Sequence, residues 1–220
     1  MFGTVKLDLE TQRQMTVQAI QEKIDEGKMT DTEEDFWDEV VEEVEVMVLK
    51  YNIDTAQTVV NWRGYEETGV ENPEYHEGTA TALEGTVEIT ETNGVIEITD
   101  ATFSVDMNSI KESNDVAKLE AHLRTPDFFN VNEFASTTFN FEKHEEGMLY
   151  GKVNIIGTDL NIVAPVSVEK GDDMVTITVE SFRIDVTPAN LPFFVAELEM
   201  EEGPDKHDPV LEFNLVVVAK

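Results

Sequence analysis

The four histidines are the first residues to examine for chemistry, because imidazole serves both as a metal ligand and as a general base. They are His76, His122, His144 and His207, and they are widely separated in the chain. No two of them have the HxH or HExxH spacing that places two imidazoles on one metal ion. We interpret each as a surface or hydrogen-bonded histidine, and we expect neither a metal site nor a cofactor.

Other catalytic groups are missing or uninformative. The chain has no cysteine, which excludes a thiol nucleophile, a zinc-thiolate site and a disulfide framework. It has no GxSxG, P-loop or GxGxxG motif, and no EF-hand loop. Carboxylates are so frequent that any pair could be offered as glycosidase machinery, which makes such a pair meaningless as a signal. We therefore expect a protein that is not an enzyme.

The charge of the chain is strongly negative, with 47 acidic and 15 basic residues and a formal net charge of −32. Such a surface repels phosphate backbones and anionic lipid head groups, so nucleic acid is not an expected partner. Its simplest interpretation is solubility, including solubility in salty surroundings that screen the self-repulsion. The alternative is a surface that binds cations or a basic partner.

The chain is rich in apolar residues that alternate with polar ones, as in strands with one buried face. In a barrel of about eight strands, the inward residues either fill the interior or line a tunnel for one slender ligand, and periodicity leaves both open. Two adjacent aromatics after Pro126 are placed at the tunnel's mouth or wall. The candidate ligand-binding residues are Trp62, Phe103, Val105, Met107, Phe128, Phe129, Phe139, Phe141, Val153, Ile155 and Phe182.

These side chains need many short strands to position them. Alternation predicts strands at 51–54 with 58–64, 79–90, 95–99, 103–108, around 139–141, 150–156, 160–168, 174–185 and 210–219. Pro165 is expected to interrupt its strand, as at an edge or bulge. The long connection before Phe139 carries Leu119 and Leu123 four residues apart, which indicates a helical turn. Connections of this length inside a compact domain tend to be functional.

Residues 1–50 differ in character, and we treat them as a separate extension before a β domain at 51–220. Val17, Ile20 and Ile24 share one helical face, and a second apolar stripe runs from Phe36 to Met47 or Val48. The valine-rich end of the second helix favours an extended last turn. We expect this helical pair to pack against the β domain; the alternatives are a lid or a dimerisation element that would make a homodimer. No secretory signal or run of ~18 apolar residues is present, so no stable membrane insertion is expected.

The most distinctive stretches are YNIDTAQTVVNWRGY, GTATALEGTVEI, FSVDMNSI, LEAHLRTPDFF, TTFNF and GKVNIIGTDLNIVAPV. Together they resemble the YceI-like lipid/polyisoprenoid-binding proteins, from about Tyr51 to the C-terminus. The last stretch is similar to the family's GxLTIxGxTxxV pattern, with Gly151, Ile155 and Gly157 in place. The family usually carries an Asp-Arg-Thr-x-aromatic-Gly segment near its end, whereas this chain has SFRIDVTPANLPFF there, with Asp185 but no matching Arg or Gly.

The resemblance implies a mainly β fold: an extended eight-stranded antiparallel barrel of lipocalin type with a short helical insertion, here preceded by the helical pair. It also implies a soluble, non-enzymatic carrier that holds a polyisoprenoid or other long-chain lipid in the barrel, located in the periplasm or secreted. Because this sequence has no signal peptide, a cytoplasmic location stays open. The alternative function is a structural or protein-interaction module with a filled barrel, whose acidic N-terminal helices contact a partner.

Overall fold

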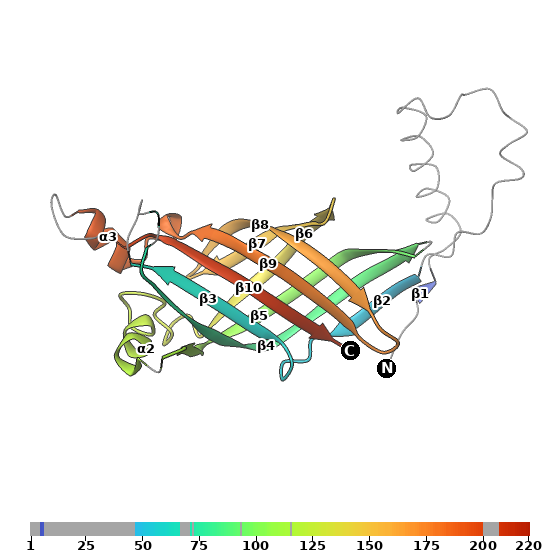
Figure 1. Ribbon diagram of the computed structural model, residues 1–220, viewed down its shortest axis with the longest axis horizontal. Coiled ribbons are helices and arrows are strands. Elements are labelled where there is room, and N and C mark those ends of the chain that lie inside the picture. Colours follow the sequence, from blue (N-terminus) through green and yellow to red (C-terminus); the bar gives the residue numbers. More distant parts are fainter. Residues whose placement is uncertain are drawn as a thin grey trace, which may run out of the picture. The chain divides into compact units, whose positions relative to one another are not determined.

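A computed structural model of the chain describes residues 5–6, 47–66, 71, 73–92, 94–114, 116–199 and 207–220 (Figure 1). Its contacts divide the chain into two compact units. One contains residues 1–50 and 88–97, and the other contains residues 51–87 and 98–220. The second unit holds the candidate site.

In the first unit, a two-residue strand β1 (Val5–Lys6) pairs antiparallel with the start of β2 (Met47–Asn52). The predicted helical pair falls outside the described residues. The second helix was predicted to reach Met47 or Val48, and this is wrong because both residues are in β2. The β-branched residues that favoured an extended last turn gave the better indication here.

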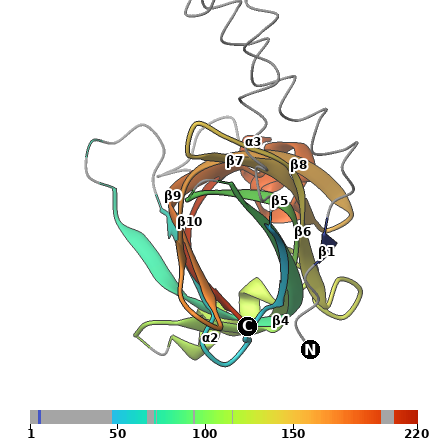
Figure 2. The same ribbon diagram turned by 90° about the vertical axis from the view of Figure 1, so that its right-hand side faces the viewer.

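Eight strands form a closed ring, and all of their described residues belong to the second unit except those within 88–97 (Figure 2). Their order is β4-β3-β10-β9-β8-β7-β6-β5, and a further pairing of β4 with β5 closes the circle. The predicted eight-stranded antiparallel barrel is thus confirmed. The strands are β3 (Val59–Tyr65), β4 (Tyr75–Thr92), β5 (Val95–Glu112), β6 (Ser136–Glu145), β7 (Met148–Ile155), β8 (Thr158–Lys170), β9 (Val175–Asp185) and β10 (Val210–Ala219).

Alternation of side chains gives these strands one buried and one more exposed face. In β9, Val175, Ile177 and Val179 are buried, while the residues between them are more exposed. The last strand, β10, pairs with β3 on one side and β9 on the other, and the pairing of β4 with β5 removes the edges that the eight strands would otherwise have. Each strand therefore directs one row of side chains into a shared interior.

Several predicted strand bounds are wrong. Residues 51–54 and 58–64 were predicted as one strand, but β2 ends at Asn52 and β3 begins at Val59. Residues 95–99 and 103–108 are parts of the single 18-residue strand β5. Pro165 does not interrupt β8, which has β7 and β9 as neighbours. The N–H of Val166 points to the carbonyl of Gly147, 2.8 Å away, so the missing N–H of Pro165 points to the other side. On that side the pairing of β8 with β9 begins only at Val166. The ladder therefore does not need the N–H that Pro165 lacks.

Three short helical elements lie outside the strands in the described part of the barrel unit. The connection from β5 to β6 contains α2 (Ala117–Leu123), as the spacing of Leu119 and Leu123 predicted. Between β9 and β10 come the 3₁₀ turn η2 (Thr187–Ala189) and α3 (Pro192–Leu198), which begins with Pro at its first position. A backbone hydrogen bond of 2.9 Å from Phe193 N–H to the Asp127 carbonyl joins α3 to the segment after α2.

Candidate functional site

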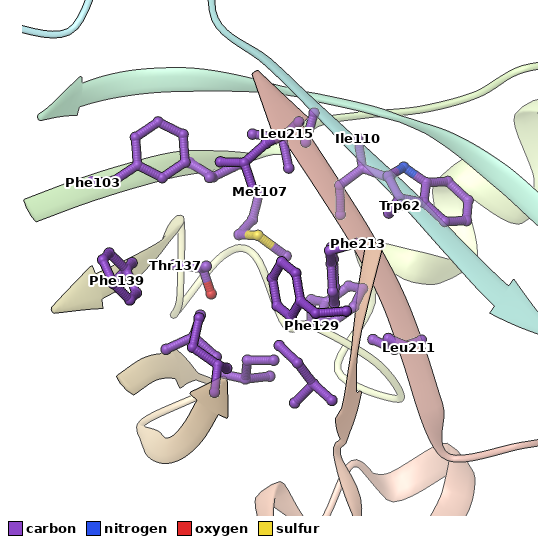
Figure 3. Close-up of a pocket in the computed structure, with 18 of the residues that line it drawn as sticks. Trp62, Phe103, Met107, Ile110, Phe129, Thr137, Phe139, Leu211, Phe213 and Leu215 are labelled. Atoms are coloured by element: carbon purple, nitrogen blue, oxygen red, sulfur yellow. The ribbon is translucent and has the colours of Figure 1, made fainter. Parts of the chain in front are cut away.

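The barrel encloses a cavity of about 460 Å³, which is lined by residues from all eight strands and from both short helices. Figure 3 shows side chains of β5 (Phe103, Met107, Ile110) and β10 (Phe213, Leu215) directed into this common space. Almost all of the lining is aliphatic or aromatic. Its volume falls within the range of ordinary small-molecule sites, roughly 300–1,000 Å³. The interior of this barrel is therefore hollow.

The structure places nearly all of the predicted site residues on this cavity. The lining includes Trp62, Phe103, Val105, Met107, Phe128, Phe129, Phe139, Val153, Ile155 and Phe182. Phe141 is the exception, although alternation puts it on the same face as Phe139. The register of β6 against β7 shifts just after Phe141, which marks the end of the regular alternation. Whether these residues contact a ligand stays a prediction.

Two glycines leave room for the aromatic rings in the lining. A Cβ on Gly151 would lie 2.3 Å from Cε2 of Phe139, so the ring of Phe139 lies directly against the bare backbone of β7. A Cβ on Gly78 would lie 2.8 Å from Cζ2 of Trp62 and 1.8 Å from the Lys111 carbonyl oxygen. Only glycine permits these close approaches.

One end of the cavity is formed by an aromatic cluster from α2, the segment after it, and α3. The rings of Phe128 and Phe193 stack with centroids 4.4 Å apart, and Phe194 meets Phe128 edge-on at 5.7 Å. His122 and His207 both pack edge-on against Phe193, at 5.7 and 5.0 Å. The α2 connection and α3 thus meet through rings at this end, which joins two segments that are remote in sequence.

The β5–α2 connection is held in place by two buried carboxylates. Glu112 accepts hydrogen bonds from the N–H groups of Asn114 (2.7 Å) and Val116 (3.2 Å), and Glu120 accepts one from the N–H of Glu112 (3.1 Å). Arg124 donates to the carbonyls of Asn108 and Ile110. Burial opposes ionisation of Glu112, but hydrogen bonds from Asn114, Val116 and His76 outweigh it and lower the pKa of Glu112.

Each of three histidines has a carboxylate beside it. The Nε2 of His76 is 2.7 Å from Glu66, the Nδ1 of His207 is 2.7 Å from Glu197, and the Nε2 of His122 is 3.6 Å from Asp127. Within the described ranges, no group of three or more His, Cys, Asp or Glu side chains is arranged to hold a metal ion. The remaining histidine, His144, accepts a hydrogen bond from the N–H of Ile98.

Sequence reasoning missed several residues of this site. Phe193 and Phe194 line the cavity, and the Leu-Pro-Phe-Phe run was a usable signal because Pro often begins a helix. Leu211, Phe213 and Leu215 were placed on one face of the last strand but were not proposed as lining, which they are. Glu112 and Glu120 carried no usable signal among so many acidic residues.

Solved structures of similar fold are found, at low sequence identity. Burkholderia cenocepacia BcnA is 15% identical with a TM-score of 0.53, and the match covers 76% of this chain and 99% of that one. A polyisoprenoid-binding domain from Saccharophagus degradans, implicated in plant cell wall breakdown, is 12% identical with a TM-score of 0.54 and coverages of 77% and 97%. At these identities the likeness concerns the fold. No curated protein sequence matches the chain.

The family is settled by the sequence of the barrel itself. A family model described as the YceI-like domain matches residues 51–201, which is more than half of the 220 residues. The matched range begins at Tyr51, where the barrel unit also begins, and it includes the α2 connection and α3. The chain belongs to the YceI-like domain family.

Proposed function

We propose that this protein is a non-enzymatic binding protein that holds a long apolar chain, such as a polyisoprenoid, inside its barrel. The observation that carries the proposal is the apolar cavity of about 460 Å³, which extends along β5 from Ile98 to Ile110. At about 3.3 Å per residue, these 12 steps correspond to roughly 40 Å of strand. A cavity that is long and apolar matches an extended hydrocarbon better than a compact polar metabolite.

Energetics support the same occupant. Each CH₂ group removed from water contributes ~0.8 kcal/mol, so a chain of several isoprene units offsets its ordering cost. The solved structure from Saccharophagus degradans is described as a polyisoprenoid-binding domain, which is consistent with this class of ligand. No described helix is long and apolar enough to cross a membrane.

The test uses the fluorescence of Trp62, which lines the cavity. The full chain, freed of lipid by organic extraction and refolding, is titrated with geranylgeraniol and solanesol, two polyisoprenoid alcohols. The chain has only two tryptophans, so Trp62→Phe identifies the signal that comes from the barrel. We expect a saturable change that Trp62→Phe abolishes, and native mass spectrometry should detect a one-to-one complex. No complex with either alcohol would refute the proposal.

A matched pair of variants tests whether the alcohol enters the barrel. Val153 lines the cavity, and Val163 is 49% exposed on β8. Val153→Phe adds bulk inside the cavity and should weaken binding at least about tenfold, or 1.4 kcal/mol. Val163→Phe adds the same bulk outside it and should leave the affinity unchanged. Equal affinity of both variants would place the ligand elsewhere.

A further inference from the structure

The charged side chains on the described cavity wall are carboxylates, and each histidine on that wall has a carboxylate beside it. Among the described residues that line the cavity, the ionisable side chains include the carboxylates of Glu66 and Asp208 and the imidazoles of His76, His122 and His207. No described lysine or arginine is in the lining. Among the described lining residues, an anionic group inside the barrel would therefore meet carboxylates and no lysine or arginine.

These groups collect at one end of the barrel, as the strand register requires. Glu66 follows the last residue of β3, and Tyr65 there pairs with Tyr75, the first residue of β4. The N–H of Asp208, just before β10, donates to the carbonyl of Tyr65 at 3.1 Å. The opposite end of the lining carries Thr86 and Thr102, whose hydroxyls are 3.3 Å apart. The cavity thus has an ionisable end and an uncharged end.

The histidines do not supply a positive charge to an anion. Both ring nitrogens of His76 face carboxylates, with Glu66 at 2.7 Å and the buried Glu112 at 3.5 Å. His207 and His122 face Glu197 and Asp127. Even a protonated imidazole here is balanced by its own carboxylate. At the same time, the carboxylate of Glu66 can accept a hydrogen bond from a neutral hydroxyl group, because its contact with His76 uses only part of its acceptor capacity.

The nearest guanidinium groups are also engaged. Arg63 lies 2.7 Å from Glu77, and Arg183 lies 3.1 Å from Glu212. Both residues are absent from the lining, since Trp62 and Phe182 before them face the cavity instead. Arg124 donates to two main-chain carbonyls of β5. None of the three is left to bind a phosphate in the barrel.

We propose that the ligand's polar end is an uncharged hydrogen-bonding group held at the Glu66–His76 pair. We also propose that the cavity rejects the same lipid when its polar end is phosphorylated. This inference rests on the proposed function and adds the class of head group. A phosphate monoester carries close to two negative charges at neutral pH. Glu66, whose side chain is 36% exposed, and Asp208 would repel such a phosphate at short range, where two like charges a few ångströms apart interact most strongly.

The test compares geranylgeraniol with geranylgeranyl monophosphate on the full chain, each present below its micelle-forming concentration. We expect the alcohol to bind at least about tenfold more tightly, or 1.4 kcal/mol. The preference should persist at about 1 M NaCl, where the Debye length is only about 3 Å and the general surface field is screened. Persistence separates the cavity wall from the −32 net charge as its cause.

A charge-matched pair of variants locates the effect. Glu66→Lys should raise the affinity for the monophosphate at least about tenfold, or 1.4 kcal/mol, because it places a cation at the ionisable end. Glu180→Lys makes the same charge change at an exposed position of β9 and should raise it much less. Circular dichroism of both variants checks that the barrel is intact, and Glu66→Gln gives a milder change in the same direction.

Three results would overturn the inference. Equal or tighter binding of the monophosphate by the unchanged protein refutes it while leaving the lipid-binding proposal intact. Loss of the preference at high salt, or equal gains from Glu66→Lys and Glu180→Lys, assigns the selectivity to the surface charge. If neither geranylgeraniol nor geranylgeranyl monophosphate binds, both the lipid-binding proposal and this inference are refuted.

Discussion

Gly78 and Gly64 lie on neighbouring strands at the same end of the barrel, but a methyl group added to each would meet different surroundings. At Gly64, the Cβ would touch only Cδ2 of Leu211, at 3.6 Å. At Gly78, it would lie 1.8 Å from the carbonyl oxygen of Lys111, which belongs to the backbone of β5. The same Cβ would lie 2.8 Å from Cζ2 of Trp62, so the added methyl group would press on both the Lys111 backbone and the Trp62 ring.

Gly78→Ala should therefore destabilise the fold by about 1–3 kcal/mol, as overpacking of a core typically does. Gly64→Ala is the matched control and should change the free energy of unfolding by no more than about 0.5 kcal/mol. Urea unfolding followed by far-UV circular dichroism measures both. An equal loss at the two positions would contradict the argument from close packing of β4 on β5.

The β5–α2 connection shows at the scale of an element how a long segment becomes ordered. Its first turn is hydrogen-bonded to the carboxylate of Glu112, whose side chain is fully buried, and Glu120 binds the backbone of Glu112 in return. The carbonyls of β5 that face the connection accept from Arg124. The aromatic cluster then rests on this framework, with Phe128 against Phe193.

The lowered pKa of Glu112 makes this element a source of pH-dependent stability. A carboxyl group whose pKa is lower in the folded state stabilises the fold fully above its ordinary value of 4.5. That contribution is lost as pH falls through the lower folded-state value. Glu112→Gln should lower stability near neutral pH and flatten the acid limb of the stability curve.

Urea unfolding at a series of pH values between about 7 and 3 tests this dependence. Glu180→Gln removes an exposed carboxylate of β9 and serves as the control, with an expected curve close to that of the unchanged protein. Parallel acid limbs for Glu112→Gln and the unchanged chain would show that Glu112 does not contribute in this way.

Sequence patterns located the strands well where alternation is regular and poorly where it is not. β9 and β10 have apolar residues at alternate positions over most of their length, as in Val175, Ile177 and Val179, and they were found almost to the residue. β5 was divided because Asp100, Ala101 and Thr102 lack a large apolar residue, although they continue the strand. The α3 helix was missed although it has seven residues like α2, because its apolar residues Phe193, Phe194 and Val195 are adjacent and do not show the helical spacing of Leu119 and Leu123.

The cavity was predictable in part of its membership but not in its existence. Alternation and the aromatic residues identified ten residues of the wall, including Trp62 and Phe139. Whether inward side chains meet or leave a space depends on ring placements such as that of Phe139 over Gly151. The pairing of His76 with Glu66 and Glu112 depends on strand register, which local sequence does not give.

At the scale of the whole molecule, the net charge of −32 acts on stability as well as on partners. Like charges repel more strongly in the compact state than in the expanded unfolded chain. Added salt screens this repulsion, since the Debye length falls from about 30 Å at 0.01 M to about 8 Å at 0.15 M. Low ionic strength should therefore weaken the fold.

The midpoint of thermal unfolding should rise as NaCl increases from about 0.01 to about 0.3 M. For a chain of this size, each kcal/mol gained corresponds to about 2–4 °C. Differential scanning calorimetry at fixed pH measures the change. Sodium thiocyanate at the same low ionic strengths is the control, because screening depends on ionic strength, whereas salting-out of apolar surface depends on the anion. A midpoint that rises with chloride but falls with thiocyanate would assign the effect to apolar surface. A midpoint that does not change with either salt would mean that the acidic residues are spaced widely enough to be tolerated without screening.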